Sequence, residues 1–163
     1  MDRVAIALGS NLGDRRAHLD FAVSRLRASI ANLRVSRYYE TEPVDAPEPQ
    51  PLFLNAAAVG DTAAPAREIL AMLMAIEQER GRARPFQNAA RTLDLDLILL
   101  GNVVLNEESL VIPHPRFRER RFVLEPLAEI APDLVDPVTG STIGTLLTTI
   151  NAEPQRPRTL PGT

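Results

Sequence analysis

Two aspartates, Asp94 and Asp96, lie two residues apart in the stretch RTLDLDLILLG, residues 91–101, among leucines and one isoleucine. Side chains of a strand alternate between faces, so both carboxylates would share one face. The opposite face would carry Leu93, Leu95, Leu97 and Leu99. Adjacent carboxylates repel each other unless a cation lies between them, and Mg²⁺ favours such oxygen ligands. The pattern predicts a magnesium site, and an exposed strand surface without a ligand is the alternative that it leaves open.

The arginines are clustered. The chain has 18 basic residues, no lysine and a net charge of -3. A guanidinium group matches the geometry of phosphate, so arginine clusters beside an aspartate pair predict a polyphosphate ligand. A general preference for arginine would account for the absence of lysine but not for the clustering. The two clusters are Arg80, Arg82, Arg84 and Arg91, and then Arg116, Arg118, Arg120 and Arg121.

Two further stretches carry candidate ligand-binding residues. In FLN, Phe53 and Asn55 would share a strand face, and a ring beside an amide suits a flat heterocycle. A core position for Phe53 is the alternative. His114, between prolines, is either a candidate hydrogen-bond donor to phosphate or a turn residue. Phe122 is either a second aromatic side chain against a planar ligand or a core residue. His18 is predicted to lie on the surface.

The stretch GSNLGD, residues 9–14, lies between a predicted strand and a predicted helix. It lacks the pattern of a conventional phosphate-binding P-loop, and the chain has no lysine to complete one. We therefore expect a tight turn in which Asp14 caps the helix.

The elements that must position these residues follow from hydrophobic periodicity and from glycine and proline punctuation. Strands are expected at 4–8, 33–40, 52–59 and 92–100, the last turning at 101–102 into a hairpin strand at 103–105. A proline-rich loop covers 41–51. Helices are expected at 14–30, 65–81 and 121–131, and a short one, capped by Ser141, ends near Ile150. This order predicts an α+β, ferredoxin-like βαββαβ sandwich with an added hairpin strand and C-terminal helices.

The length of 163 residues predicts a single domain over residues 1–150, followed by a disordered tail at 151–163. The negative net charge argues against a protein that coats nucleic acid. No apolar run is long enough to span a membrane, and the absence of cysteine excludes disulfides and thiolate metal sites. We expect a cytoplasmic monomer that binds neither nucleic acid nor membrane.

With these motifs assembled, the chain resembles the 6-hydroxymethyl-7,8-dihydropterin pyrophosphokinase family over about residues 2–150. The motifs are GSNLGD, YYETEP, FLNAAA, the E-x-x-x-G-R run ending at Arg82, RTLDLDLILLG and IPHPR. The resemblance implies transfer of the β,γ-diphosphate of ATP to the hydroxymethyl group of a reduced pterin, with release of AMP, in folate biosynthesis. It also implies two Mg²⁺ ions held by Asp94 and Asp96.

The resemblance assigns further roles by matching positions. Arg82 and Arg91 would act in catalysis beside the two aspartates, and His114, Arg120 and Arg84 would bind the phosphates. Leu97 and Val111 would contact adenine through backbone groups. The pterin pocket would consist of Thr41, Pro43, Val44, Phe53, Asn55 and Phe122, with the two phenylalanines sandwiching the ring.

One departure from the family pattern precedes RTLDLD. Family members commonly carry an aromatic residue followed by Gly-Pro there, whereas this chain has Asn88, Ala89 and Ala90, with Phe86 as the nearby aromatic.

Two other functions fit parts of the pattern. An aspartate pair with arginine clusters also suits a metal-dependent phosphohydrolase or nuclease, and a ferredoxin-like domain can bind a small molecule without catalysis. Neither alternative accounts for FLN, the proline-rich loop and the aspartate strand together.

Overall fold

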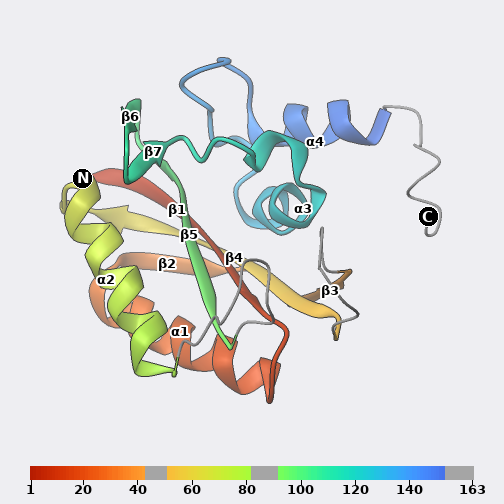
Figure 1. The fold of residues 1–163 in the computed structure, drawn as a ribbon. Helices are drawn as coiled ribbons and strands as arrows, with labels where there is room; N and C mark the ends of the chain where they lie inside the picture. The colour runs from red at the N-terminus through yellow and green to blue at the C-terminus, as the bar shows by residue number, and fades with distance from the viewer. Residues whose placement is uncertain (43–50, 82–91, 153–163) are drawn as a thin grey trace.

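A computed structural model describes residues 1–42, 51–81 and 92–152. Its elements form the α+β fold class expected from the sequence, with helices packed on an antiparallel sheet (Figure 1). The strands are β1 (Asp2–Ser10), β2 (Ala31–Val35), β3 (Tyr39–Thr41), β4 (Phe53–Thr62), β5 (Asp94–Leu100), β6 (Leu105–Glu107) and β7 (Leu110–Ile112). The helices are α1 (Arg15–Ser29), α2 (Ala66–Glu79), the 3-10 turn η1 (Phe117–Glu119), α3 (Arg121–Ile130) and α4 (Ile143–Ala152).

The central sheet has the strand order β2-β4-β1-β5, and β3 also pairs with β4. Every pairing in it is antiparallel. Helices α1 and α2 cover one face of this sheet, and α3 and α4 lie on the other side (Figure 1). The sheet is therefore the middle of three layers.

Alternation along β1 divides its side chains between two cores. Val4, Ile6 and Leu8 pack with the apolar residues of α1 and α2, whereas Ala5 packs with those of α3 and α4. Both faces of the strand are covered, which explains the continuous apolar stretch VAIAL. Ala5, Ala7 and Ala57 give the sheet small side chains on the face towards α3.

The first two helices begin and end as the sequence predicts. Asp14 accepts a hydrogen bond from the backbone N–H of Ala17 at 3.1 Å and so caps α1. Pro65 immediately precedes α2, where its missing N–H costs nothing. After α2, Gly81 has a φ of 80°, a conformation that ends a helix readily only with glycine.

The expected strand at 33–40 is two strands, β2 and β3. Both pair with β4, but Val35 lies opposite Ala58 and Tyr39 lies opposite Asn55, so the strand break contains one extra residue. At the break, the backbone N–H of Ser36 donates to the Ala57 carbonyl, and the Ser36 hydroxyl accepts from the Ala57 N–H. The Ser36 hydroxyl thus takes the place of the backbone carbonyl that would accept from Ala57 in a regular strand pair.

The prediction that Leu99 shares a face with Leu97 is wrong. Ile6 pairs with Leu97 but Ala5 pairs with Leu99, so Ile98 is an extra residue of β5. Such a bulge shifts all later side chains by one position. Leu97 therefore packs under α1 and α2, whereas Leu99 packs under α3.

Three smaller expectations also need correction. Residues 103–105 do not form a hairpin with β5; β6 instead pairs with β7 in a separate two-stranded sheet. The hydroxyl of Thr142, and not that of Ser141, accepts a bond from the Thr145 N–H at the start of α4. Residues 151 and 152, which the sequence assigned to a disordered tail, are the last two residues of α4.

Several predicted positions lie outside the described residues. They are Pro43, Val44, Arg82, Arg84, Phe86, Asn88, Ala89, Ala90, Arg91 and the tail from residue 153. Among the residues that the structure does describe, no helix is long and apolar enough to cross a membrane.

Candidate active site

A row of paired residues crosses four strands on the face that α3 covers. Tyr39 of β3 pairs with Asn55 of β4, Asn55 pairs with Gly9 of β1, and Gly9 pairs with Asp94 of β5. Paired residues of an antiparallel sheet project to the same face. The amide of Asn55 and the carboxylate of Asp94 therefore face the same side, two strand spacings or about 10 Å apart.

Asp94 and Asp96 share this face, as the sequence predicts. Asp96 pairs with Ala7, and both carboxylates are half-buried. Two residues of strand separate them by about 7 Å, which allows the oxygens to hold one or more cations in line. Within the described ranges, no group of three or more His, Cys, Asp or Glu side chains forms a closed metal cage. Two carboxylates on one strand face suit Mg²⁺, which completes its shell with water and phosphate.

Gly9 is the floor between the amide and the carboxylates, a role that the sequence reasoning missed. A Cβ atom at this position would lie 3.1 Å from Nδ2 of Asn55 and 3.5 Å from the Phe53 ring. The missing side chain therefore leaves the surface beside Asn55 and Phe53 open. A glycine that lies in a strand, next to its turn, is the sequence signal that would have indicated a close approach.

Thr41 and Asn55 are brought together. The hydroxyl of Thr41, the last residue of β3, donates to Oδ1 of the buried Asn55. This bond occupies the amide oxygen and leaves Nδ2 directed towards Gly9. In this arrangement Asn55 offers a hydrogen-bond donor to a ligand above the sheet.

The two candidate ring walls lie on the same side of the sheet. Phe53 lies beside Gly9 on the face that α3 covers, and Phe122 is in the first turn of α3. The Arg120 guanidinium lies over the Phe122 ring, 5.5 Å from its centroid. This contact places Arg120, a candidate phosphate-binding residue, next to Phe122, a candidate aromatic contact of the pterin ring.

His114 lies close enough to Asp94 to interact electrostatically with it. The His114 N–H donates to the carbonyl of Ile98, the extra residue of β5, at 3.0 Å. Burial, together with the positive charge of Arg120, lowers the pKa of His114 to about 4, although Asp94 opposes the shift. Nδ1 accepts from the Arg116 N–H, so the neutral ring carries its proton on Nε2. The imidazole is therefore a neutral donor.

The two candidate adenine contacts lie on neighbouring strands, Leu97 on β5 of the central sheet and Val111 on β7 of the two-stranded sheet. The Leu97 side chain is buried among the residues under α1 and α2, so it is not available to a ligand and only backbone groups could make the contact. Val111 is the central residue of β7, which contacts β5. Both placements are compatible with backbone recognition.

Glu77 is a second residue that the sequence reasoning left without a role. It is buried on α2, and its carboxylate accepts a 2.7 Å hydrogen bond from the Leu95 N–H. Leu95 lies between the two aspartates, so this acid braces the strand that carries them. Its spacing of four residues from Leu73, on the apolar stripe of α2, is the signal that could have marked it as buried.

The expectation for His18 is wrong. It is half-buried, and its Nδ1 accepts a 2.8 Å bond from Nε of Arg80, just before Gly81. Burial lowers the pKa of His18, Arg80 lowers it further, and Asp14 opposes both. The contact joins the start of α1 to the end of α2.

Comparison with known proteins identifies the family. A family model described as 7,8-dihydro-6-hydroxymethylpterin-pyrophosphokinase (HPPK) matches residues 5–132. The 2-amino-4-hydroxy-6-hydroxymethyldihydropteridine pyrophosphokinase of Bacillus subtilis is 42% identical over 144 residues, covering 86% of each chain. The enzyme of the same name from Pseudomonas aeruginosa is 40% identical over 136 residues, covering 82% of this chain and 83% of its own.

Some relatives are longer proteins. The folic acid synthesis protein fol1 of Pneumocystis carinii is 41% identical over 143 residues, which are 87% of this chain but 19% of that protein. The crystal structure of wild-type Plasmodium falciparum HPPK-DHPS with SDX-DHP has a TM-score of 0.68 at 15% identity. The match covers 91% of this chain and 43% of that one, and at this identity it shows similarity of fold alone. The family match and the similarity to relatives of its own length show that the chain belongs to the 7,8-dihydro-6-hydroxymethylpterin-pyrophosphokinase family.

Proposed function

We propose that the chain transfers the β,γ-diphosphate of ATP to the hydroxymethyl group of 6-hydroxymethyl-7,8-dihydropterin and releases AMP, as a step of folate biosynthesis. The family match over residues 5–132 supports the reaction. The structural observation that carries it is the row in which Asn55, Gly9 and Asp94 lie side by side across three strands. This row places a hydrogen-bond donor suited to a heterocycle, Asn55, near a carboxylate suited to a phosphate-bound cation, Asp94.

The pterin end of the site is built on β3, β4 and α3. Asn55 donates from Nδ2 to the polar edge of the ring, and Thr41 holds the amide in that orientation. Phe53 and Phe122 lie against the two faces of the ring, above the floor left open by Gly9. By the family resemblance, Pro43 and Val44 would also contact the pterin. With about 10 Å between Asn55 and Asp94, a bicyclic ring at Asn55 directs its hydroxymethyl arm towards the aspartates.

The phosphate end is built on β5 and on the segment that leads into α3. Asp94 and Asp96 would hold two Mg²⁺ ions, and such ions would supply neutralisation of the triphosphate charge and polarisation of its β-phosphorus. The donors that position the phosphates are Arg82, Arg84, Arg91, Arg120 and Nε2 of His114. Backbone groups at Leu97 and Val111 bind adenine.

The reaction requires alignment more than covalent participation by the protein. The hydroxymethyl oxygen forms a bond to the β-phosphorus, and the bond from that phosphorus to the α,β-bridging oxygen breaks. The bridging oxygen leaves with AMP, and the hydroxyl proton is released. Arg82 and Arg91 offset the charge that develops on the leaving group.

Chromatography of the nucleotide products tests this proposal. The protein is incubated with MgATP, with and without 6-hydroxymethyl-7,8-dihydropterin. AMP that forms only with the pterin, in equal amount to a pterin diphosphate, is the expected result. ADP would mean single phosphoryl transfer, and release of nucleotide or orthophosphate without pterin would favour a phosphohydrolase. Binding of both ligands without turnover would favour a non-catalytic module.

Two finer features belong to the same proposal. The strand order β2-β4-β1-β5, with α1 and α2 on one face, supports the ferredoxin-like arrangement. The large exposed apolar side chains of the described residues are scattered over several elements, which supports a monomer. Light scattering coupled to size-exclusion chromatography would test the second feature, and a mass of twice 17.9 kDa would contradict it.

A further inference from the structure

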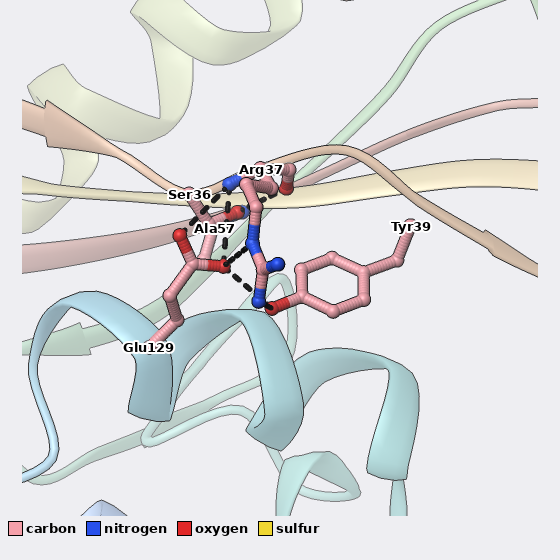
Figure 2. Close-up of polar contacts among 5 residues, drawn as sticks. All are labelled: Ser36, Arg37, Tyr39, Ala57 and Glu129. Carbon is pink, nitrogen blue, oxygen red and sulfur yellow. Dashed lines mark hydrogen bonds and ion pairs between the residues drawn. The ribbon is translucent and has the colours of Figure 1, made fainter.

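A polar network joins α3 to the break between β2 and β3 (Figure 2). The Glu129 carboxylate accepts hydrogen bonds from the Arg37 N–H at 3.1 Å, from Arg37 Nε at 3.3 Å and from the Tyr39 hydroxyl. The Arg37 guanidinium also lies over the Tyr39 ring, 5.6 Å from its centroid. Three donors from two residues of one short segment therefore converge on one acid of the helix.

The same segment is held to the sheet from its other side. Ser36, which is 5% exposed, exchanges hydrogen bonds of 2.9 Å with both backbone groups of Ala57. Its hydroxyl also donates to the Arg37 carbonyl at 2.7 Å. Figure 2 shows Ser36 and Arg37 between the β4 backbone at Ala57 and the Glu129 side chain. The strand break is thus a fixed link between β4 and α3.

Both elements that this link joins, β3 and α3, carry residues of the proposed pterin site. Tyr39 pairs with Asn55, and Thr41 of the same strand donates to the Asn55 amide. On the helix, Phe122 and Glu129 are seven residues apart, which places them on the same helix face about 10.5 Å apart along the axis. One helix face therefore carries a ring wall at one end and the anchor to β3 at the other.

Stability is not the main consequence of this network. The Arg37 side chain is 78% exposed and that of Glu129 is 26% exposed, and exposed ion pairs contribute little to folding. What the bonds restrict is the position of α3 over the sheet. Small displacements of groups that bind a substrate reduce turnover strongly, so position matters at this place.

We propose that Glu129 is a positioning residue for the pterin slot: it ties α3 to β3 and thereby sets the gap between Phe122 and the Thr41–Asn55 edge. This inference rests on the proposed function. It concerns mainly the pterin end, because Asp94, Asp96 and His114 lie on elements outside the network, and Arg120, at the start of α3, is the one described phosphate-binding candidate that adjoins the helix.

The test compares Glu129→Ala and Glu129→Gln with the unchanged protein and with Glu125→Ala. Glu125 is an exposed acid of the same helix and serves as the matched control. Binding is measured with an ATP analogue that has a methylene bridge between the α- and β-phosphorus. The first quantity is the Kd of 6-hydroxymethyl-7,8-dihydropterin in the presence of Mg²⁺ and this analogue, and the second is the Kd of the analogue alone with Mg²⁺. The third is KM for each substrate in the reaction.

Glu129→Ala is expected to raise the pterin Kd and KM about tenfold and to leave the analogue Kd within about twofold. Glu129→Gln retains an acceptor oxygen and should recover part of the loss, and Glu125→Ala should change neither ligand. Tyr39→Phe removes one donor and should act in the same direction but less strongly. Its effect should largely disappear in the Glu129→Ala background, because both residues belong to one network.

Equal losses for both ligands, or no loss for pterin in folded Glu129→Ala, would overturn the inference. If Glu129→Ala does not fold, as judged by circular dichroism, Glu129→Gln and Tyr39→Phe give the same comparison. The outcome is distinct from failure of the proposed function, in which the unchanged protein itself would form no pterin diphosphate.

Discussion

Asn55 and Asp94 lie on opposite sides of Gly9, each one strand away, and face the same side of the sheet. The two residues are far apart in the chain, but the order β4-β1-β5 makes them near neighbours. The residue between them has no side chain, so a ligand can contact the amide and the carboxylate at once.

Substitution of Gly9 by alanine should obstruct the pterin end of the site. The added methyl group would lie 3.1 Å from Nδ2 of Asn55, and overpacking of this kind costs about 1–3 kcal/mol. We expect the pterin KM to rise about tenfold with KM for ATP little changed. Gly144→Ala, at a helix position where the new Cβ would meet its nearest atom at 3.4 Å, is the control. Equal pterin KM values for Gly9→Ala and the unchanged protein would show that ligand does not reach this floor.

Asp94→Ala and Asp96→Ala should each reduce turnover by more than about 100-fold while the protein stays folded. Both carboxylates are half-buried at the surface of the sheet, so their loss removes cation ligands without opening the core. Turnover is measured as AMP formed, and folding by circular dichroism. Asp133→Ala, at an exposed position between α3 and α4, should behave like the unchanged protein. Near-normal activity of either variant would refute the metal assignment.

Phe53→Ala should weaken pterin binding about tenfold or more, because stacking of a ring on an aromatic side chain contributes about 1–3 kcal/mol. The nucleotide is not expected to contact this ring, so affinity for the ATP analogue should be retained. Calorimetric titration of each ligand separates the two effects. Comparable losses for both would mean that Phe53 supports the whole sheet face and not the pterin pocket.

Arg118 and Asp136 give a prediction about stability. Asp136 is fully buried and accepts bonds of 2.5 and 3.0 Å from Arg118, and others from the Val138 N–H and the Thr139 hydroxyl. Burial by itself raises the pKa of Asp136, but the bonds from these donors outweigh it, so the pKa lies below its ordinary value. Arg118→Ala leaves a buried carboxylate without its cation and should cost about 3 kcal/mol of unfolding free energy at pH 7.

The pH dependence of this loss has a definite sign. A depressed pKa in the folded state contributes stability above the unfolded value, about 3.9, and that contribution is lost as pH falls through the folded pKa. The difference between Arg118→Ala and the unchanged protein should therefore shrink below about pH 4. Denaturant unfolding at pH 7 and pH 3 measures it, and the same difference at both values would contradict the assignment.

Local patterns were sufficient where one element decides the outcome. Period-two alternation placed Asp94 and Asp96 on one strand face, and Asp14 capped the first helix as expected. Alternation failed at Leu99, because the bulge at Ile98 arises from how β5 pairs with β1. The strand break at Ser36 has the same origin, since a bulge is a property of two paired strands and not of one sequence.

The sequence by itself determined which residue types were available and which neighbours along the chain share a face, because strand and helix periods are local. It also carried enough family motifs to identify the chemistry to be expected. Only the tertiary structure decided that Asn55 and Asp94 flank Gly9. The same holds for the hydrogen bonds that Glu77 accepts from the Leu95 N–H and that Glu129 accepts from Tyr39 and Arg37. These contacts depend on strand order and on helix packing across long stretches of chain, which no local period encodes.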